Sequence, residues 1–78
     1  MYDVSVRLNT VDKVKDFVSK VSKFNCPLDV KAGSRFIDAK SIMGFYTLNL
    51  SDPINVKIIT GDDGVYRDVV NSISEYLV

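Results

Sequence analysis

Few side chains in this sequence are suited to chemistry, because the chain has no histidine. Histidine is the commonest general base, the usual partner of a nucleophilic serine or cysteine, and the commonest metal ligand. A single cysteine, Cys26, excludes an intramolecular disulfide and a cysteine-based zinc cluster. We therefore expect no enzymatic activity, no cofactor and no metal site.

Two hydroxyl side chains, Thr10 and Ser41, lie where helices are expected to begin, and each is a natural N-cap. Free amides at a helix start also attract anions, so an anion site is a second interpretation of Thr10-Val11-Asp12. The negative charge of the Asp12 carboxylate argues against that interpretation. Ser41 is either a plain cap or a phosphorylation site. A phosphoserine at an N-cap places a charge of about −2 beside unsatisfied amides, which is favourable.

Two further groups of residues are expected to be structural. Asp62-Asp63-Gly64 superficially resembles an acidic metal loop, but no other oxygen ligands follow at fixed spacing, so we interpret it as a turn and a helix cap. Cys26 stands beside Pro27 at a helix exit and is predicted to be a small buried hydrophobe.

Composition limits the class of protein. The chain has 78 residues, of which 46% are hydrophobic and 26% are charged, which predicts one folded domain, 1–78, with one thin core. Ten basic and ten acidic residues give zero net charge, which argues against a protein that binds nucleic acid by neutralising phosphates. No apolar run approaches the ~20 residues that cross a membrane, and no secretion signal is evident, so we expect a cytoplasmic protein without a membrane partner.

The hydrophobic pattern predicts the elements that position these residues. Residues 2–8 alternate as a half-buried strand does, and apolar residues from Val11 to Phe24 recur at helical spacing, which predicts a helix over 10–24. Asn25 and Pro27 end that helix.

The second half of the pattern completes the fold. Residues 28–32 and 35–38 predict a hairpin, a short helix follows Ser41, residues 54–58 predict a strand, and Tyr66 to Leu77 keep helical spacing. The order β-α-β-β-α-β-α predicts an α+β fold with a four-stranded antiparallel sheet and three helices on one face.

The segment Lys40-Ser41-Ile42-Met43-Gly44 resembles the regulatory-serine segment of HPr, the phosphocarrier of the sugar phosphotransferase system. Ser22-Lys23-Phe24 lies at the spacing from that serine that the family shows. The order of elements is similar to the open-faced β-sandwich of HPr, so the resemblance covers nearly the whole chain. The specific string is nevertheless confined to residues 40–44.

The chemistry that defines the HPr family is missing. HPr carries phosphate on a histidine at the start of its first helix, whereas the corresponding stretch here is Leu8-Asn9-Thr10-Val11-Asp12-Lys13. Asp12 stands about where the phosphate-neutralising arginine of the family lies, and a carboxylate there repels a phosphoryl group. The resemblance therefore implies a degenerate phosphocarrier site at Thr10, Val11 and Asp12 that cannot carry phosphohistidine.

The resemblance also implies a protein-contact role. In many HPr proteins from Gram-positive bacteria this serine is phosphorylated by a dedicated kinase, and the product joins a catabolite-control transcription factor. By resemblance, Ser41 is the phosphorylation site, Ile42, Met43 and Tyr46 form a partner interface, and Lys20 and Lys23 border it. The implied partners are an HPr kinase, that transcription factor or another phosphotransferase-system component.

Three hypotheses remain open for this bacterial-type sequence. The first is a non-catalytic, HPr-like regulatory or protein-interaction domain. The second is a small-molecule or anion-binding module that uses the helix starts at Thr10 and Ser41. The third is a structural domain that forms a homodimer through Ile42, Met43 and Tyr46. Each of these residues can also be purely structural. Lysines on a helix are usually solvated, and apolar residues at helical spacing often belong to the core.

Overall fold

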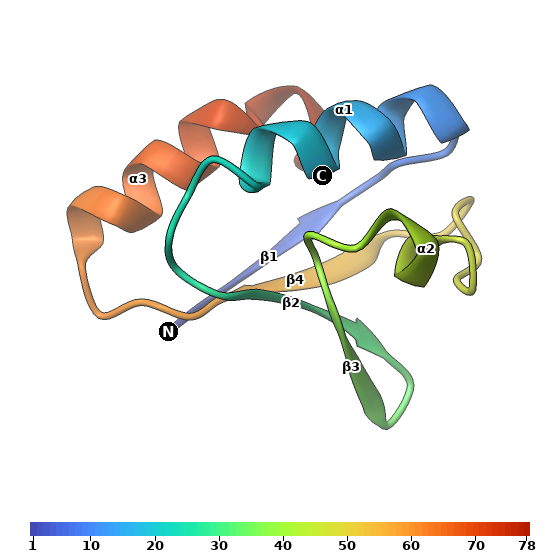
Figure 1. Ribbon diagram of the computed structural model, residues 1–78, viewed down its shortest axis with the longest axis horizontal. Coiled ribbons are helices and arrows are strands. Elements are labelled where there is room, and N and C mark those ends of the chain that lie inside the picture. Colours follow the sequence, from blue (N-terminus) through green and yellow to red (C-terminus); the bar gives the residue numbers. More distant parts are fainter.

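The computed structural model describes the whole chain, residues 1–78, as a four-stranded sheet whose helices all lie on one side (Figure 1). The elements in chain order are β1 (Tyr2–Val6), α1 (Val11–Val21), β2 (Leu28–Ala32), β3 (Arg35–Asp38), α2 (Ile42–Phe45), β4 (Ile54–Ile58), α3 (Asp63–Ser72) and a 3-10 turn (Ser74–Tyr76). The predicted α+β class, the element order and the antiparallel sheet are confirmed. None of the helices is long and apolar enough to cross a membrane.

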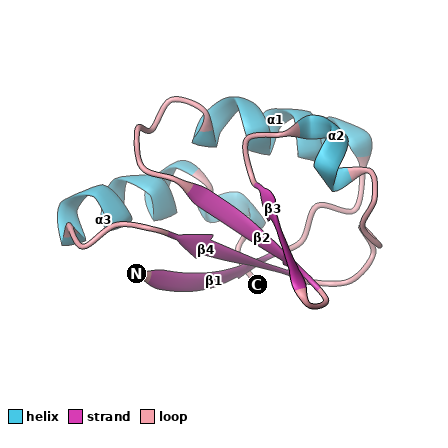
Figure 2. Ribbon diagram, turned by 60° about the horizontal axis from the view of Figure 1, so that its bottom comes forward, coloured by secondary structure: helices cyan, strands magenta, loops and turns pink.

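The strands lie in the order β1-β4-β2-β3, and every neighbouring pair is antiparallel. The β1 edge is covered by the end of the chain, because the Val78 amide donates to the Ser5 carbonyl and the Arg7 amide donates to the Tyr76 carbonyl. β3 forms the opposite edge. The far face of the sheet carries no helix and stays open (Figure 2).

The core lies between the sheet and the helices and is entirely apolar. Its sixteen buried residues include no polar or charged side chain. Phe17 of α1 is central, because its ring contacts Phe45 of α2 edge-on at 5.7 Å and Tyr76 at 6.3 Å. These aromatic contacts join the three helical segments into one layer.

The three helices begin at the predicted caps. The Thr10 hydroxyl accepts from the Lys13 amide, the Ser41 hydroxyl from the Gly44 amide, and the Asp62 carboxylate from the Gly64 and Val65 amides. Each bond satisfies an amide that the first helical turn leaves without a partner.

Several predicted boundaries were too long. β1 ends at Val6 and α1 at Val21, and α3 stops at Ser72 although the helical spacing continues. Leu77 bridges to Val6 instead of continuing a helix, because pairing with the β1 edge satisfies backbone groups that a longer helix would leave exposed.

Two burial predictions also need correction. Helical spacing predicts Val11 on the apolar face of α1, but Val11 is 48% exposed, because side chains at a helix start point back toward its N-terminus and therefore past the core. Cys26 packs against the core as a small hydrophobe, but its predicted burial is only partial. It lies in the irregular segment between α1 and β2, outside the close-packed layers.

Candidate functional site

α2 is held in place from two sides, although it is only four residues long. On one side the Phe45 ring is fully buried against Phe17 of α1. On the other side Gly44 lies so close to β3 that a Cβ atom at this position would come within 2.3 Å of the Ile37 Cγ2 atom. The hydrogen at this position therefore sets how closely α2 approaches the sheet.

The outward side of α2 exposes large apolar side chains. Met43 is 73% exposed and Tyr46 is 43% exposed, whereas Ile42 is half-buried and packs against the core. We call Ser41, Met43 and Tyr46 the α2 surface. Of the three predicted apolar interface residues, two therefore face solvent and the third serves mainly to anchor the helix.

Ser41 lies in a segment fixed by several hydrogen bonds. Its hydroxyl oxygen is 3.3 Å from the Gly44 amide nitrogen, and its own amide donates to the Asp38 carbonyl. The preceding Lys40 donates through Nζ to the Phe24 carbonyl at 2.6 Å, which ties this segment to the loop that follows α1. Ser41 as a whole is half-buried, as is the hydrogen bond that its hydroxyl accepts.

Lys20 faces the 3-10 turn. Its ammonium pairs with Asp16 at 3.0 Å and with Glu75, and lies 5.4 Å from the centre of the Tyr76 ring. These carboxylates raise the pKa of Lys20, with Glu75 contributing most. Lys23 is exposed and forms no ion pair. The two lysines therefore differ in their roles. Lys20 is ion-paired within the fold, whereas Lys23 is free to contact a partner.

The same cluster perturbs two other groups. The Tyr76 hydroxyl donates to Asp16, and this bond, with the Lys20 bond second, lowers the pKa of the Asp16 carboxyl. Burial, and then the bond to Asp16, raises the pKa of Tyr76 to about 12. The cluster lies within the helical layer and ties the 3-10 turn to α1.

The start of α1 offers little to an incoming phosphoryl group. Val11 and Asp12 are exposed, and the Thr10 hydroxyl is engaged with the Lys13 amide at 3.2 Å. The Lys13 ammonium donates to the Asn9 side chain at 3.0 Å, and Asp12 pairs with no cation. In Figure 1 this helix start and α2 lie toward the same end of the molecule.

The acidic residues near α3 have structural partners. Asp62 caps the helix as predicted, and Asp63 accepts from the Tyr2 hydroxyl, a bond that is the main cause of the raised pKa of Tyr2. The Tyr2 ring stacks on Tyr66 at 4.0 Å, so β1 and α3 are joined here.

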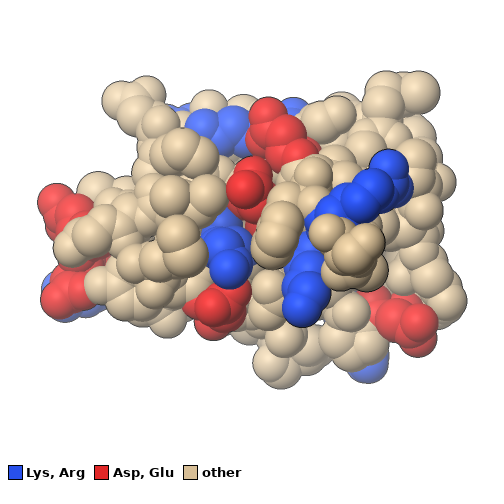
Figure 3. Space-filling model, turned by 90° about the horizontal axis from the view of Figure 1, so that it is seen from below, with Lys and Arg blue, Asp and Glu red and all other residues tan.

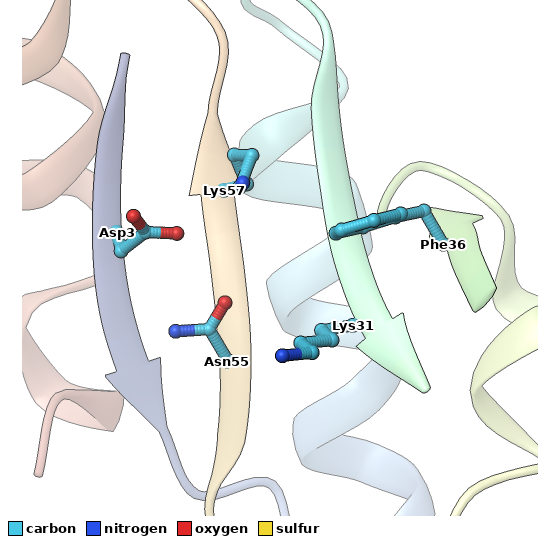
Figure 4. A pocket seen from close by; sticks show the side chains of 5 residues that line it. All are labelled: Asp3, Lys31, Phe36, Asn55 and Lys57. Carbon is cyan, nitrogen blue, oxygen red and sulfur yellow. The ribbon is translucent and has the colours of Figure 1, made fainter. Parts of the chain in front are cut away.

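Basic and acidic side chains lie side by side on the open face of the sheet (Figure 3). This face contains a hollow that was not predicted from the sequence (Figure 4). We call it the open-face hollow, and it is lined by Asp3, Lys31, Phe36, Asn55 and Lys57. The alternation along the strands places these residues on the outer face, but which of them become neighbours depends on strand order and register.

Comparison with known proteins supports the fold. No family model matches the chain, and no curated protein matches it. Among solved structures, the crystal structure of HPr-C-His from Thermoanaerobacter tengcongensis matches with a TM-score of 0.71 and 25% identity, over 96% of this chain and 93% of that one. The chain therefore has an HPr-like fold.

Proposed function

We propose that this protein is a divergent HPr-type regulatory domain that acts by protein contact and has lost histidine phosphotransfer. The carrying observation is the α2 surface, where Ser41 stands beside exposed Met43 and Tyr46 on an HPr-like fold whose sequence has no histidine. A contact of this kind uses exposed apolar side chains as its centre and needs no catalytic group.

In this proposal Ser41 is the switch. A phosphoryl group on its oxygen adds about −2 charge and three acceptor oxygens next to the exposed apolar side chains. The serine already precedes α2 and is bonded to its Gly44 amide, so the modification changes surface charge more than shape. The partners are an HPr kinase and a protein of the catabolite-control or phosphotransferase-system type, in the cytoplasm.

Loss of histidine phosphotransfer has a direct test. The protein is incubated with phosphoenolpyruvate and the first enzyme of the phosphotransferase system, and its intact mass is measured. We expect no added phosphoryl group, because Thr10, Val11 and Asp12 supply no histidine and no neutralising cation, and the Thr10 hydroxyl is engaged as the helix cap. A phosphoryl group added to any side chain would refute this part of the proposal.

The contact role is tested with a surface variant. Met43→Lys replaces a side chain that is 73% exposed, so it should leave stability within about 0.5 kcal/mol while weakening partner binding. The matched control is Val78→Lys, which changes an apolar residue that is 65% exposed at the end of the chain. Binding of the Ser41-phosphorylated protein to a catabolite-control transcription factor is measured by calorimetry. Equal binding by both variants would contradict the proposed surface.

Self-association through the same surface is the second candidate, and it rests on the exposure of Met43 and Tyr46. Sedimentation over a range of concentrations decides it. A concentration-dependent mass that Met43→Lys abolishes and Val78→Lys preserves would favour a homodimer, whereas a constant monomer mass would leave a different protein as the partner.

A further inference from the structure

The open-face hollow is a small concave site on the side of the sheet away from α2. It has a volume of about 470 Å³, which is within the size range of small-molecule sites. All five lining side chains project from the strands into the hollow (Figure 4). Its four polar side chains make no hydrogen bond and no ion pair with the rest of the chain, so their polar groups are free to bind a ligand.

Two unpaired ammonium groups define one part of the hollow. Lys57 of β4 lies directly opposite Asp3 of β1 and Asp29 of β2, yet forms an ion pair with neither. Its ammonium instead lies 5.2 Å from the centre of the Phe36 ring. Lys31, the residue paired with Phe36 across β2 and β3, points into the same space. Neither ammonium has an ion-pair partner, so both are free to attract an anionic group of a ligand.

The β1 side of the hollow has the opposite charge. Asp3 lies there beside the amide of Asn55, and both point into the hollow (Figure 4). A simple anion such as phosphate would be attracted by the lysines but repelled by this carboxylate. A ligand that carries an ammonium group next to its anionic group would satisfy both ends of the hollow.

The β3 side of the hollow is aromatic. Phe36 is 53% exposed, and it is the one hydrophobic residue among the five that line the hollow. Aromatic rings of two partners stack or meet edge to face, so this side favours a flat ring on the ligand.

We propose that the open-face hollow binds an α-amino acid with an aromatic side chain. The ligand carboxylate lies between the Lys31 and Lys57 ammoniums, the ligand ammonium faces Asp3 and the Asn55 amide oxygen, and the ligand ring packs on Phe36. The arrangement follows the strand order, because β1, β4, β2 and β3 present these groups in that sequence across the sheet. The inference is independent of the α2 surface.

The first test is a titration of isotope-labelled protein with L-phenylalanine, followed by the amide NMR signals. We expect saturable shifts of the amide signals of Lys31, Asn55 and Lys57. The dissociation constant should be about 1 mM, because the ligand is small and the site is shallow. Three analogues each remove one feature: 3-phenylpropanoate lacks the ammonium, 2-phenylethylamine lacks the carboxylate and L-alanine lacks the ring. Each should bind at least about tenfold more weakly, which is the loss of one charge-assisted or aromatic contact.

The second test uses variants. Lys57→Met should weaken L-phenylalanine binding about tenfold or more, because it removes one ammonium from the carboxylate position and keeps an unbranched side chain on β4. The matched control, Lys15→Met, changes an exposed lysine of α1 in the helical layer and should bind as the parent does. Amide spectra confirm that both variants fold. No saturable shift, equal binding of inorganic phosphate, or equal loss in both variants would overturn the proposal.

Discussion

Gly44→Ala tests how the fold positions α2. The added Cβ atom would lie 2.3 Å from the Ile37 Cγ2 atom, whereas ordinary contact begins at 3.4 Å, so the two elements must separate by about 1.1 Å, the difference of these distances. Overpacking of this kind costs about 1–3 kcal/mol. Replacing glycine by alanine inside a helix returns about 1 kcal/mol at most. A separation of about 1.1 Å places the overpacking cost near the upper end of its range, so we expect a net loss of about 2 kcal/mol.

Thermal unfolding followed by circular dichroism measures this loss. In a domain of this size each 1 kcal/mol lowers Tm by about 4–8 °C. Gly61→Ala is the matched control, because nothing lies within 4 Å of a Cβ atom at that position and no strained backbone is recorded there. It should leave Tm nearly unchanged.

A double-mutant cycle then identifies the cause. Ile37→Ala removes the Cγ2 atom that the new methyl group would meet, so Gly44→Ala should become neutral or stabilising in that background. If Gly44→Ala is as stable as the parent, or loses the same stability with and without the Ile37 side chain, the close approach of α2 to β3 does not set the position of the helix.

Three further predictions concern stability and titration. Ser41→Ala removes the acceptor of the Gly44 amide bond and should cost about 1 kcal/mol, measured as a lower urea midpoint, whereas an unchanged midpoint would show that the cap is not needed. Asp16→Asn should destabilise the protein at pH 7. Because the fold lowers the pKa of Asp16, the stability that its carboxylate contributes is present above the usual pKa of about 3.9 and is lost as the pH falls through the lowered folded value. The stabilities of parent and variant should therefore converge in acid. A difference in stability that stays constant with pH would contradict this linkage. Tyr76 should ionise near pH 12 in an absorbance titration, and the stability from its neutral form should be lost as the pH rises from about 10 through about 12. The ionisation step near pH 12 should be absent in Tyr76→Phe. If the step remains in this variant, its assignment to Tyr76 is wrong.

Much of the fold could be predicted because its signals are local. Alternation marks the strands, and a hydroxyl or carboxylate before each apolar-periodic run marks the starts of α1, α2 and α3. The end of α3 could not be predicted from local patterns, because Leu77 keeps helical spacing but forms an antiparallel bridge with Val6 at the sheet edge.

The candidate sites depended on contacts between distant segments. The role of Lys20 required Glu75, which is far along the chain, and the exposure of Met43 required the packing of Phe45 against Phe17. Helix periodicity reports which residues share a face, but it does not report what that face meets. The open-face hollow was hidden for the same reason, because its residues come from four strands.

In the proposed function, this HPr-like domain is controlled at Ser41 and not at a histidine. The most direct measurement is intact-protein mass after incubation with an HPr serine kinase and ATP, with Ser41→Ala and the exposed hairpin variant Ser34→Ala as controls. We expect one added phosphoryl group in the parent and in Ser34→Ala, and none in Ser41→Ala. No addition to the parent, or an addition that survives in Ser41→Ala, would contradict it.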